Sequence, residues 1–164
     1  MASPVAEIER LMIAANVARW AGHAAAEAER ELAARFRIQQ TLAVYGTLAP
    51  GRPNHDVVSP LGGEWTEGVI EGDLFPVGWG ATLGYPAFRP RAGGPAVRVH
   101  VLKAEALASA WPRLDRFEGP GYRRILVPVF TPATDERRLY TIANLYAAAD
   151  PAPGEAGVRE SRER

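Results

Sequence analysis

The sequence predicts an α+β fold in which a helical segment precedes a mixed, mostly antiparallel sheet that can curl into a barrel. Two observations lead to this prediction. The composition changes near Arg37: the segment before it is rich in Ala, Glu and Arg, whereas the remainder is dense in Gly, Pro, Val and aromatic residues. The remainder also contains at least four strand-like apolar stretches, joined by short links with few helices between them.

The helical segment begins at Ser3-Pro4, where a serine can cap the helix and a proline fits its first position. Glu7 and Glu9 follow, where negative charge favours the positive end of the helix dipole. Apolar side chains recur every three or four residues as far as Phe36, although Gly22 can bend or split the helix. Most of this stripe is alanine, which buries little area. We therefore expect it to pack on its own domain or to pair with a second copy in a homodimer.

Four strands are predicted after this segment. The first covers residues 41–48 and ends at the turn signal Ala49-Pro50-Gly51. Apolar residues alternate with others in the remaining three strands, which cover 97–102, 122–130 and 138–147. Such alternation is typical of strands that bury one face of a sheet.

Shorter elements are predicted between and after these strands. Residues 103–110 and 112–117 are predicted to form two short helical pieces with a hinge at Pro112. The Gly- and Pro-dense stretch 76–95 is predicted to be an irregular loop with at most a brief strand. The last residues, 149–164, are small or charged and include proline, so they are predicted to be disordered.

Composition limits the classes of function. A chain of 164 residues can form one hydrophobic core but not two full domains. The absence of cysteine excludes disulfides, thiolate nucleophiles and cysteine-based metal sites. Nineteen basic side chains balance nineteen acidic ones, so no basic field favours binding to nucleic acid. No long apolar run predicts a membrane span and no signal peptide is evident, so we expect a cytoplasmic protein.

The sequence contains no nucleophile elbow, Walker loop, dinucleotide-binding loop or zinc-protease motif. Its three histidines, His23, His55 and His100, lie far apart in the chain, and no metal site is predicted. His55 follows Asn54 in a turn-rich loop. We expect its ring to bond to nearby backbone groups.

Two short motifs contain groups that could take part in ligand binding or catalysis. In the first, Tyr45-Gly46-Thr47-Leu48, a strand ends in a turn and leaves backbone N–H groups that can hold a carboxylate or an oxyanion. In the second, Glu118 follows Phe117 and precedes a Gly-Pro-Gly break. A glutamate in such a place is either a solvated helix-end residue or a carboxyl held in an apolar pocket, where its raised pKa makes it a usable base near neutral pH.

Together these motifs resemble the γ-glutamylcyclotransferase-like superfamily, in particular its AIG2-like or γ-glutamylamine cyclotransferase branch. The resemblance covers the barrel domain, residues 41–148, and its pieces occur in the family's order and spacing. They are V-Y-G-T-L at 44–48, G-R-P-N-H at 51–55, V-I-E-G-D-L-F at 69–75, Gly78-Trp79, Tyr85-Pro86-Ala87 and L-D-R-F-E-G-P-G-Y-R-R at 114–124. The resemblance implies a γ-glutamylcyclotransferase-like barrel of five or six strands with a pocket at one mouth, behind an N-terminal extension, residues 1–40.

The resemblance also implies a reaction and its residues. Glu118 would be the general base that takes a proton from the α-amine of a γ-glutamyl group, which then closes a 5-oxoproline ring and expels an amine. The loop Tyr45, Gly46, Thr47 and Leu48 would bind the α-amino acid end of the substrate. Tyr122 would line the pocket or hold Glu118, whereas Arg124 and Tyr146 are weaker candidates with structural roles. No metal or organic cofactor is implied, and the partner is a small-molecule substrate.

Two alternatives remain open at this stage. The same fold could serve as a non-catalytic domain that binds a small ligand, because fold does not determine function. It could also serve as an interaction module that acts through its Ala-rich helix. Ala49-Pro50 stands where the family often has a basic residue, so the sequence does not identify the amine that leaves.

Overall fold

The computed structural model describes residues 3–75, 87–132 and 136–149. The predicted tail beyond Ala149 and the motif residues Gly78-Trp79 and Tyr85-Pro86 lie outside these ranges. The helices are α1 (Pro4–Trp20), α2 (Ala26–Phe36) and α3 (Trp111–Glu118), and the strands are β1 (Thr41–Val44), β2 (Glu64–Phe75), β3 (Ala87–Pro90), β4 (Ala96–Lys103), β5 (Tyr122–Phe130) and β6 (Leu139–Ala148).

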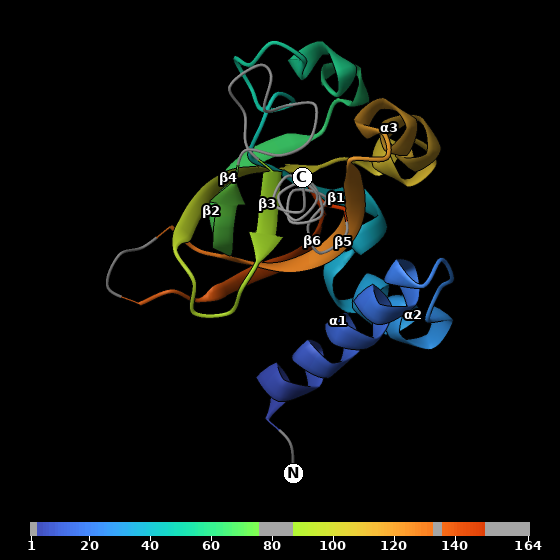
Figure 1. Ribbon diagram of the computed structural model, residues 1–164, viewed down its shortest axis with the longest axis vertical. Coiled ribbons are helices and arrows are strands. Elements are labelled where there is room, and N and C mark those ends of the chain that lie inside the picture. The colour runs from blue at the N-terminus through green and yellow to red at the C-terminus, as the bar shows by residue number, and fades with distance from the viewer. Residues whose placement is uncertain (1–2, 76–86, 133–135, 150–164) are drawn as a thin grey trace, which may run out of the picture.

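Five strands close into a barrel in the order β2-β4-β1-β6-β5, because β5 also pairs with β2 at Phe130 and Val69. Strands β1 and β6 run parallel, and the other pairings are antiparallel. Strand β3 adds to β2 outside this closed ring. The predicted α+β fold with a mixed, mostly antiparallel barrel is therefore confirmed (Figure 1).

The barrel interior is filled by one of the two faces that the alternation predicts for each strand. From β5 and β6 this face contributes Ile125, Val127, Val129, Ala143 and Leu145, which pack against Ile70, Phe88, Val99 and Val101. The opposite face of the same two strands carries Leu126 and Ile142, and it is also buried. Strands with two buried faces need a second layer on the outside of the barrel.

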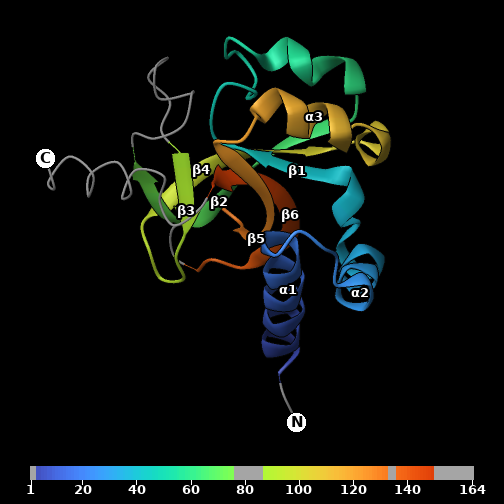
Figure 2. The same cartoon turned by 45° about the vertical axis from the view of Figure 1, so that its right-hand side comes forward.

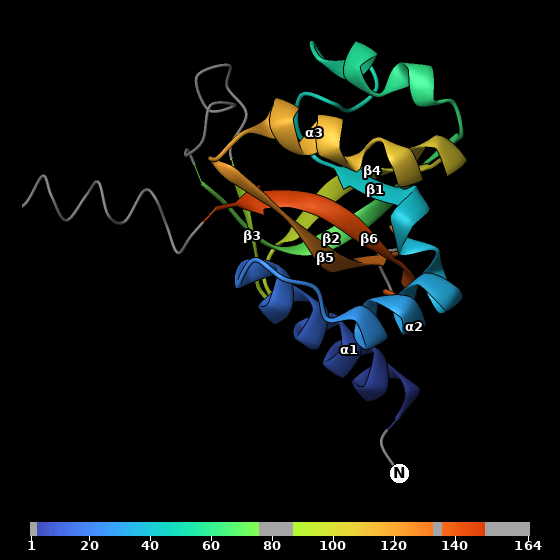
Figure 3. The same ribbon diagram turned by 90° about the vertical axis from the view of Figure 1, so that its right-hand side faces the viewer.

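Helices supply that layer on two sides. Helices α1 and α2 pack on Leu126 and Ile142 through Ala15, Ala28 and Leu32. Helix α3 lies at the other end of the barrel, where Trp111 and Leu114 pack on Leu42 and Tyr146. In Figure 3 the strands lie between α3 and the pair α1–α2, and Figure 2 shows the same arrangement from a second direction.

The N-terminal segment forms two helices and not a single one as far as Phe36. Ser3 caps α1 through its hydroxyl, as predicted, and accepts a hydrogen bond from the N–H of Ala6 at 3.2 Å. The helix ends because Gly22 adopts φ 85°, so that the N–H groups of Gly22 and His23 turn back to the carbonyls of Arg19 and Ala18. Of the two outcomes open at Gly22, a bend or a split, the chain takes the split.

Three further elements differ from the prediction. Strand β1 ends at Val44 and not at residue 48, because Tyr45–Leu48 turns away from the sheet. Strand β2, twelve residues long, was not predicted. The predicted helical pieces occur as a 3-10 turn at Glu105–Ser109 and as α3, which begins one residue before Pro112.

Helix α1 is apolar on two faces. One face packs on the barrel, whereas Val5, Ile13, Val17 and Trp20 are exposed on the other. Nothing in the structure tests whether a second copy covers these side chains, so the homodimer through this segment stays a prediction. Among the described residues, no helix combines the length and the apolarity needed to cross a membrane.

A single side chain of α1 completes the edge of the barrel. Asn16 accepts a hydrogen bond from the N–H of Leu126 and donates one to the carbonyl of the same residue, both at 2.8 Å. Leu126 lies in the part of β5 that does not pair with β2, and its side chain is 1% exposed. The Asn16 amide thus occupies the place of a neighbouring strand.

We predict that Asn16→Ala lowers the free energy of unfolding by about 2–4 kcal/mol, because two buried backbone groups lose their partners. Urea denaturation monitored by circular dichroism measures this loss. The neighbouring Val17→Ala is the matched control, and it should stay within about 0.5 kcal/mol because Val17 is exposed. Equal stability of the two variants would contradict the pairing of α1 with β5.

Candidate functional site

Helix α3 ends at Glu118, and the sequence that follows forces the end. Gly119 adopts φ 76°, and its N–H bonds to the carbonyl of Asp115 at 3.1 Å. Pro120 and Gly121 then carry the chain into β5, which begins at Tyr122. Glu118 is therefore the last helical residue, and with Phe117 and the residues of the Gly-Pro-Gly break it lines an open surface pocket of about 450 Å³.

The Glu118 side chain is turned into the protein. The residue is 9% exposed. Of the two arrangements that the sequence allows for Glu118, the carboxyl is therefore the buried one and not a solvated residue at a helix end. Burial raises the pKa of its carboxyl from 4.5 to about 7. Its position at the negative end of the α3 dipole acts in the same direction. A carboxyl with this pKa exists in both protonation states near neutral pH, as a general base requires.

The loop Tyr45–Leu48 leaves the barrel at the end of β1. Thr47 and Leu48 are buried, and the carbonyl of Leu48 contacts Nδ1 of His55 at 2.9 Å. The predicted local role of His55 is therefore observed. Within the described part of the chain, the N–H groups of Gly46, Thr47 and Leu48 donate to no other group, and a Cβ added at Gly46 would meet no atom within 4 Å.

Tyr45 anchors this loop to the barrel through its hydroxyl group. Its hydroxyl donates to the carbonyl of Tyr146 at 2.7 Å and accepts from the N–H of Phe88 at 3.0 Å. Burial raises the pKa of this phenol well above its ordinary value. The ring of Tyr45 therefore holds the loop on β3 and β6, and the loop can offer backbone groups to a ligand.

The structure brings the predicted site residues into one region. Tyr45 interacts electrostatically with both Tyr122 and Glu118, which lie more than seventy residues further along the chain. Leu48 belongs to the same apolar cluster as Phe117 and Tyr122. The loop after β1, the end of α3 and the start of β5 therefore lie near one another in the folded chain.

A second acidic residue on α3, Asp115, has its pKa shifted in the opposite direction. Asp115 accepts two hydrogen bonds from Arg124, from Nε at 2.9 Å and from Nη2 at 3.3 Å, and a third from the Tyr146 hydroxyl at 2.6 Å. Burial alone would raise the pKa of Asp115, but these hydrogen bonds hold it below its ordinary value. Arg124 and Tyr146 thus fix α3 and do not face Glu118 as free groups.

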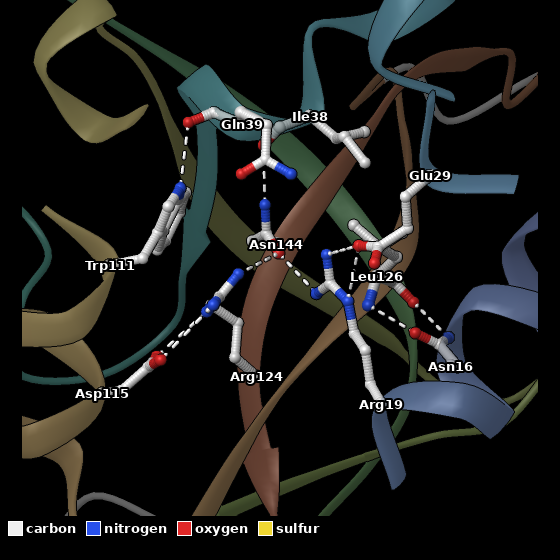
Figure 4. Close-up of polar contacts among 10 residues, drawn as sticks. All are labelled: Asn16, Arg19, Glu29, Ile38, Gln39, Trp111, Asp115, Arg124, Leu126 and Asn144. Atoms are coloured by element: carbon white, nitrogen blue, oxygen red, sulfur yellow. Dashed lines mark hydrogen bonds and ion pairs between the residues drawn. The ribbon is translucent and has the colours of Figure 1, made fainter. Parts of the chain in front are cut away.

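Arg124 leads to a fully buried amide, Asn144 on β6 (Figure 4). The Asn144 Oδ1 atom accepts from Nη1 of Arg124 at 3.2 Å and from Nη1 of Arg19 at 2.7 Å. Its Nδ2 atom donates to the carbonyl of Ile38 at 2.6 Å. Sequence analysis missed Asp115, Asn144 and Arg19 as contributors. The one available signal was a polar residue on an otherwise apolar strand face, between Ile142 and Tyr146.

Within the described ranges, no group of three His, Asp or Glu side chains is arranged to hold a metal ion. His23 lies after α1, His55 bonds to its own loop, and His100 on β4 lies 3.9 Å from Glu67.

The profile of the family described as "Gamma-glutamyl cyclotransferase, AIG2-like" matches residues 42–162. The crystal structure of an AIG2-like protein from Mus musculus is 23% identical with a TM-score of 0.52, covering 70% of this chain and 80% of that one. An uncharacterized protein from Pyrococcus horikoshii is 21% identical with a TM-score of 0.48, covering 75% and 95%. No curated protein matches the chain.

The raised pKa of Glu118 predicts a cost in stability that depends on pH. Between pH 4.5 and about 7 the carboxyl ionises in the unfolded chain but not in the folded one. The folded state therefore loses stability as the pH rises through this window, by about 3 kcal/mol in total, and the loss is constant above it. Glu118→Gln should remove this dependence, so its stability relative to the natural chain should increase between about pH 4 and about pH 8.

Urea denaturation over this pH range measures the difference. The same substitution at the exposed Glu105 is the control, since it changes the formal charge equally without a buried carboxyl. A stability difference for Glu118→Gln that does not vary with pH would contradict a raised pKa at this residue.

Proposed function

The chain belongs to the Gamma-glutamyl cyclotransferase, AIG2-like family, and from this premise we propose that it releases 5-oxoproline and a free amine from a γ-glutamyl amine or peptide. Family membership agrees with the resemblance that the motifs carry, over nearly the same residues. Family membership supports this reaction class, and both the reaction and the roles of individual residues below are part of the proposal.

The proposed reaction is an intramolecular acyl transfer. The α-amine nitrogen of the substrate bonds to the γ-carbonyl carbon while Glu118 takes one proton from that nitrogen. The tetrahedral intermediate then collapses, the bond between the γ-carbon and the leaving nitrogen breaks, and the proton on Glu118 passes to the departing amine. The substrate carries its own nucleophile, so the protein must supply only a folded-back pose, one base and donors for the oxyanion.

The observation that carries this proposal is the state of Glu118. It is a carboxyl at 9% exposure, with a pKa raised by burial to about 7, and the preceding Phe117 packs in the same apolar cluster as Leu48 of the loop after β1. Burial of a carboxyl costs folding free energy, and a domain that only binds a ligand has no need of it. Strongly shifted carboxyls of this kind concentrate at catalytic sites.

The loop after β1 is the proposed binding element for the α-amino acid end of the substrate. The N–H groups of Gly46, Thr47 and Leu48 are suited to a carboxylate or to the developing oxyanion. The open space beside Gly46 lets a ligand approach the backbone closely. In this proposal Tyr45 positions the loop, and Tyr122 lines the same pocket. The proposed reaction needs no metal or organic cofactor, and a cytoplasmic location is part of the proposal.

We predict that Glu118→Gln retains the fold and loses release of 5-oxoproline by about 10²- to 10⁴-fold, the usual contribution of a general base. The measurement is chromatographic detection of 5-oxoproline from a panel of γ-glutamyl amines and γ-glutamyl dipeptides. Glu105→Gln is the matched control, because Glu105 is exposed in the 3-10 turn before α3 and should retain full activity.

The alternative of a ligand-binding domain has a distinct outcome. The natural chain would then bind members of the panel but turn none of them over. Equal turnover by Glu118→Gln and the natural chain would instead reject Glu118 as the base.

The pKa of Glu118 also predicts the pH dependence of the reaction. The base must be ionised, so kcat/KM should rise with pH and level off above about 7. The α-amine of the substrate titrates as well, so two substrates whose amines differ in pKa should be compared. If kcat/KM rises near the same pH of about 7 with both substrates, the titrating group belongs to the enzyme. If no such rise occurs, Glu118 is not the base.

A further inference from the structure

Arg19, in the last turn of α1, reaches the outer face of the barrel. Its Nε atom donates to Glu29 of α2 at 2.9 Å, and its Nη2 atom contacts the same carboxylate oxygen. Its Nη1 atom donates to Asn144 of β6 at 2.7 Å. Arg19 therefore joins both N-terminal helices to a strand that begins 120 residues later (Figure 4).

Asn144 places two cations around one oxygen atom. Arg19 and Arg124 both donate to its Oδ1 atom, and each is neutralised on its far side by a carboxylate, Glu29 for Arg19 and Asp115 for Arg124. Asn144 is fully buried, and the Asn144 amide is itself fixed by the carbonyl of Ile38. The direction of the Arg124 guanidinium therefore depends on three anchors, namely Asn144, Asp115 and the face of Trp111 at 4.6 Å.

Helix α3 connects the contacts of Arg124 to Glu118. Asp115 lies one turn before Glu118 on this short helix, and its carboxylate is held by Arg124 and Tyr146. Helix α3 spans eight residues, so a shift of Asp115 moves the whole helix. The phenol of Tyr45, which interacts electrostatically with Glu118, is hydrogen-bonded to β6 and β3, so α3 is not what holds it in place.

We propose that Arg19 is a positioning residue for the candidate active site: anchored by Glu29, it orients Asn144 and Arg124, and through Asp115 it sets the place of α3 and of the Glu118 carboxyl. The inference rests on the proposed function in taking Glu118 as the reactive base. It gives the N-terminal helices a role in placing the carboxyl of Glu118.

The test is a charge-balanced double variant, Arg19→Met with Glu29→Gln, which removes one cation and one anion and so leaves the net charge unchanged. Any change at Glu118 then reflects position and not the loss of a nearby charge. The matched control is Asn16→Ala, which removes a different polar contact between α1 and the barrel, to the backbone of Leu126, and leaves the hydrogen bonds of Arg19 in place.

Two readouts are needed. Carbon-13 NMR titration of the Glu118 side-chain carboxyl reports its solvation without any activity. In the double variant we expect its pKa to fall toward the ordinary range, because a loosened α3 exposes the carboxyl to water. With an active substrate we expect kcat to fall about tenfold or more with little change in KM, since misplacement of a base affects the chemical step. The control should change neither value.

The outcomes separate the two ideas. The positioning role is overturned if the titration of Glu118 is unchanged in the double variant, or if Asn16→Ala shifts it equally. If the titration shifts only in the double variant but the natural chain turns over no γ-glutamyl compound, the coupling of Arg19 to Glu118 stands and the proposed reaction fails. If the natural chain is active and the double variant retains its kcat, the positioning role fails and the proposed reaction stands.

Discussion

The contact on which the rest of the structure depends is the buried side chain of Asn144. Its amide bonds at the same time to the N-terminal segment, to a neighbouring guanidinium on β5 and to the backbone before β1. A buried amide has a strict requirement for partners of the right kind, because an unpaired donor or acceptor costs about 1–3 kcal/mol. All of its partners are polar groups from separate elements, so the barrel, α1 and α3 can only assemble in one relative position.

The need of the Asn144 amide for polar partners explains how the N-terminal helices keep a defined position on the barrel although they bury little hydrophobic area there. Their buried residues on the barrel are mostly small, such as Ala15, Ala18 and Ala28. Small side chains allow close approach but distinguish poorly between neighbouring registers. The hydrogen bonds of Asn16 to Leu126 and of Arg19 to Asn144 fix the register along and across the strands. Alanine thus sets the distance between the layers, and two polar side chains set their alignment.

The parts of the fold that local pattern determines could be predicted, and the parts set by distant packing could not. The alternation in β5 and β6 and the cap at Ser3 follow from neighbouring residues. Strand β2 escaped prediction because Gly68 and Gly72 look like strand breakers. A Cβ at Gly68 would lie 2.4 Å from Val129, and one at Gly72 would lie 2.5 Å from the ring of Phe88. These glycines serve the strand, since its partners come so close. Glu118 was recognisable by its motif, whereas two of the partners of Asn144, Arg19 and Ile38, lie over 100 residues away.

The two carboxyls of α3 show how this scaffold creates a candidate site. Asp115 and Glu118 lie on one helix, yet their pKa values are pushed apart. Asp115 is kept ionised by hydrogen bonds from Arg124 and Tyr146, and burial raises the pKa of Glu118 to about 7. An ionised, paired carboxylate can anchor a helix, and a carboxyl near neutral pKa can exchange protons. The two roles are linked physically: the burial that makes Glu118 useful costs folding free energy, and the Asp115 clamp holds α3 in the position where that burial persists.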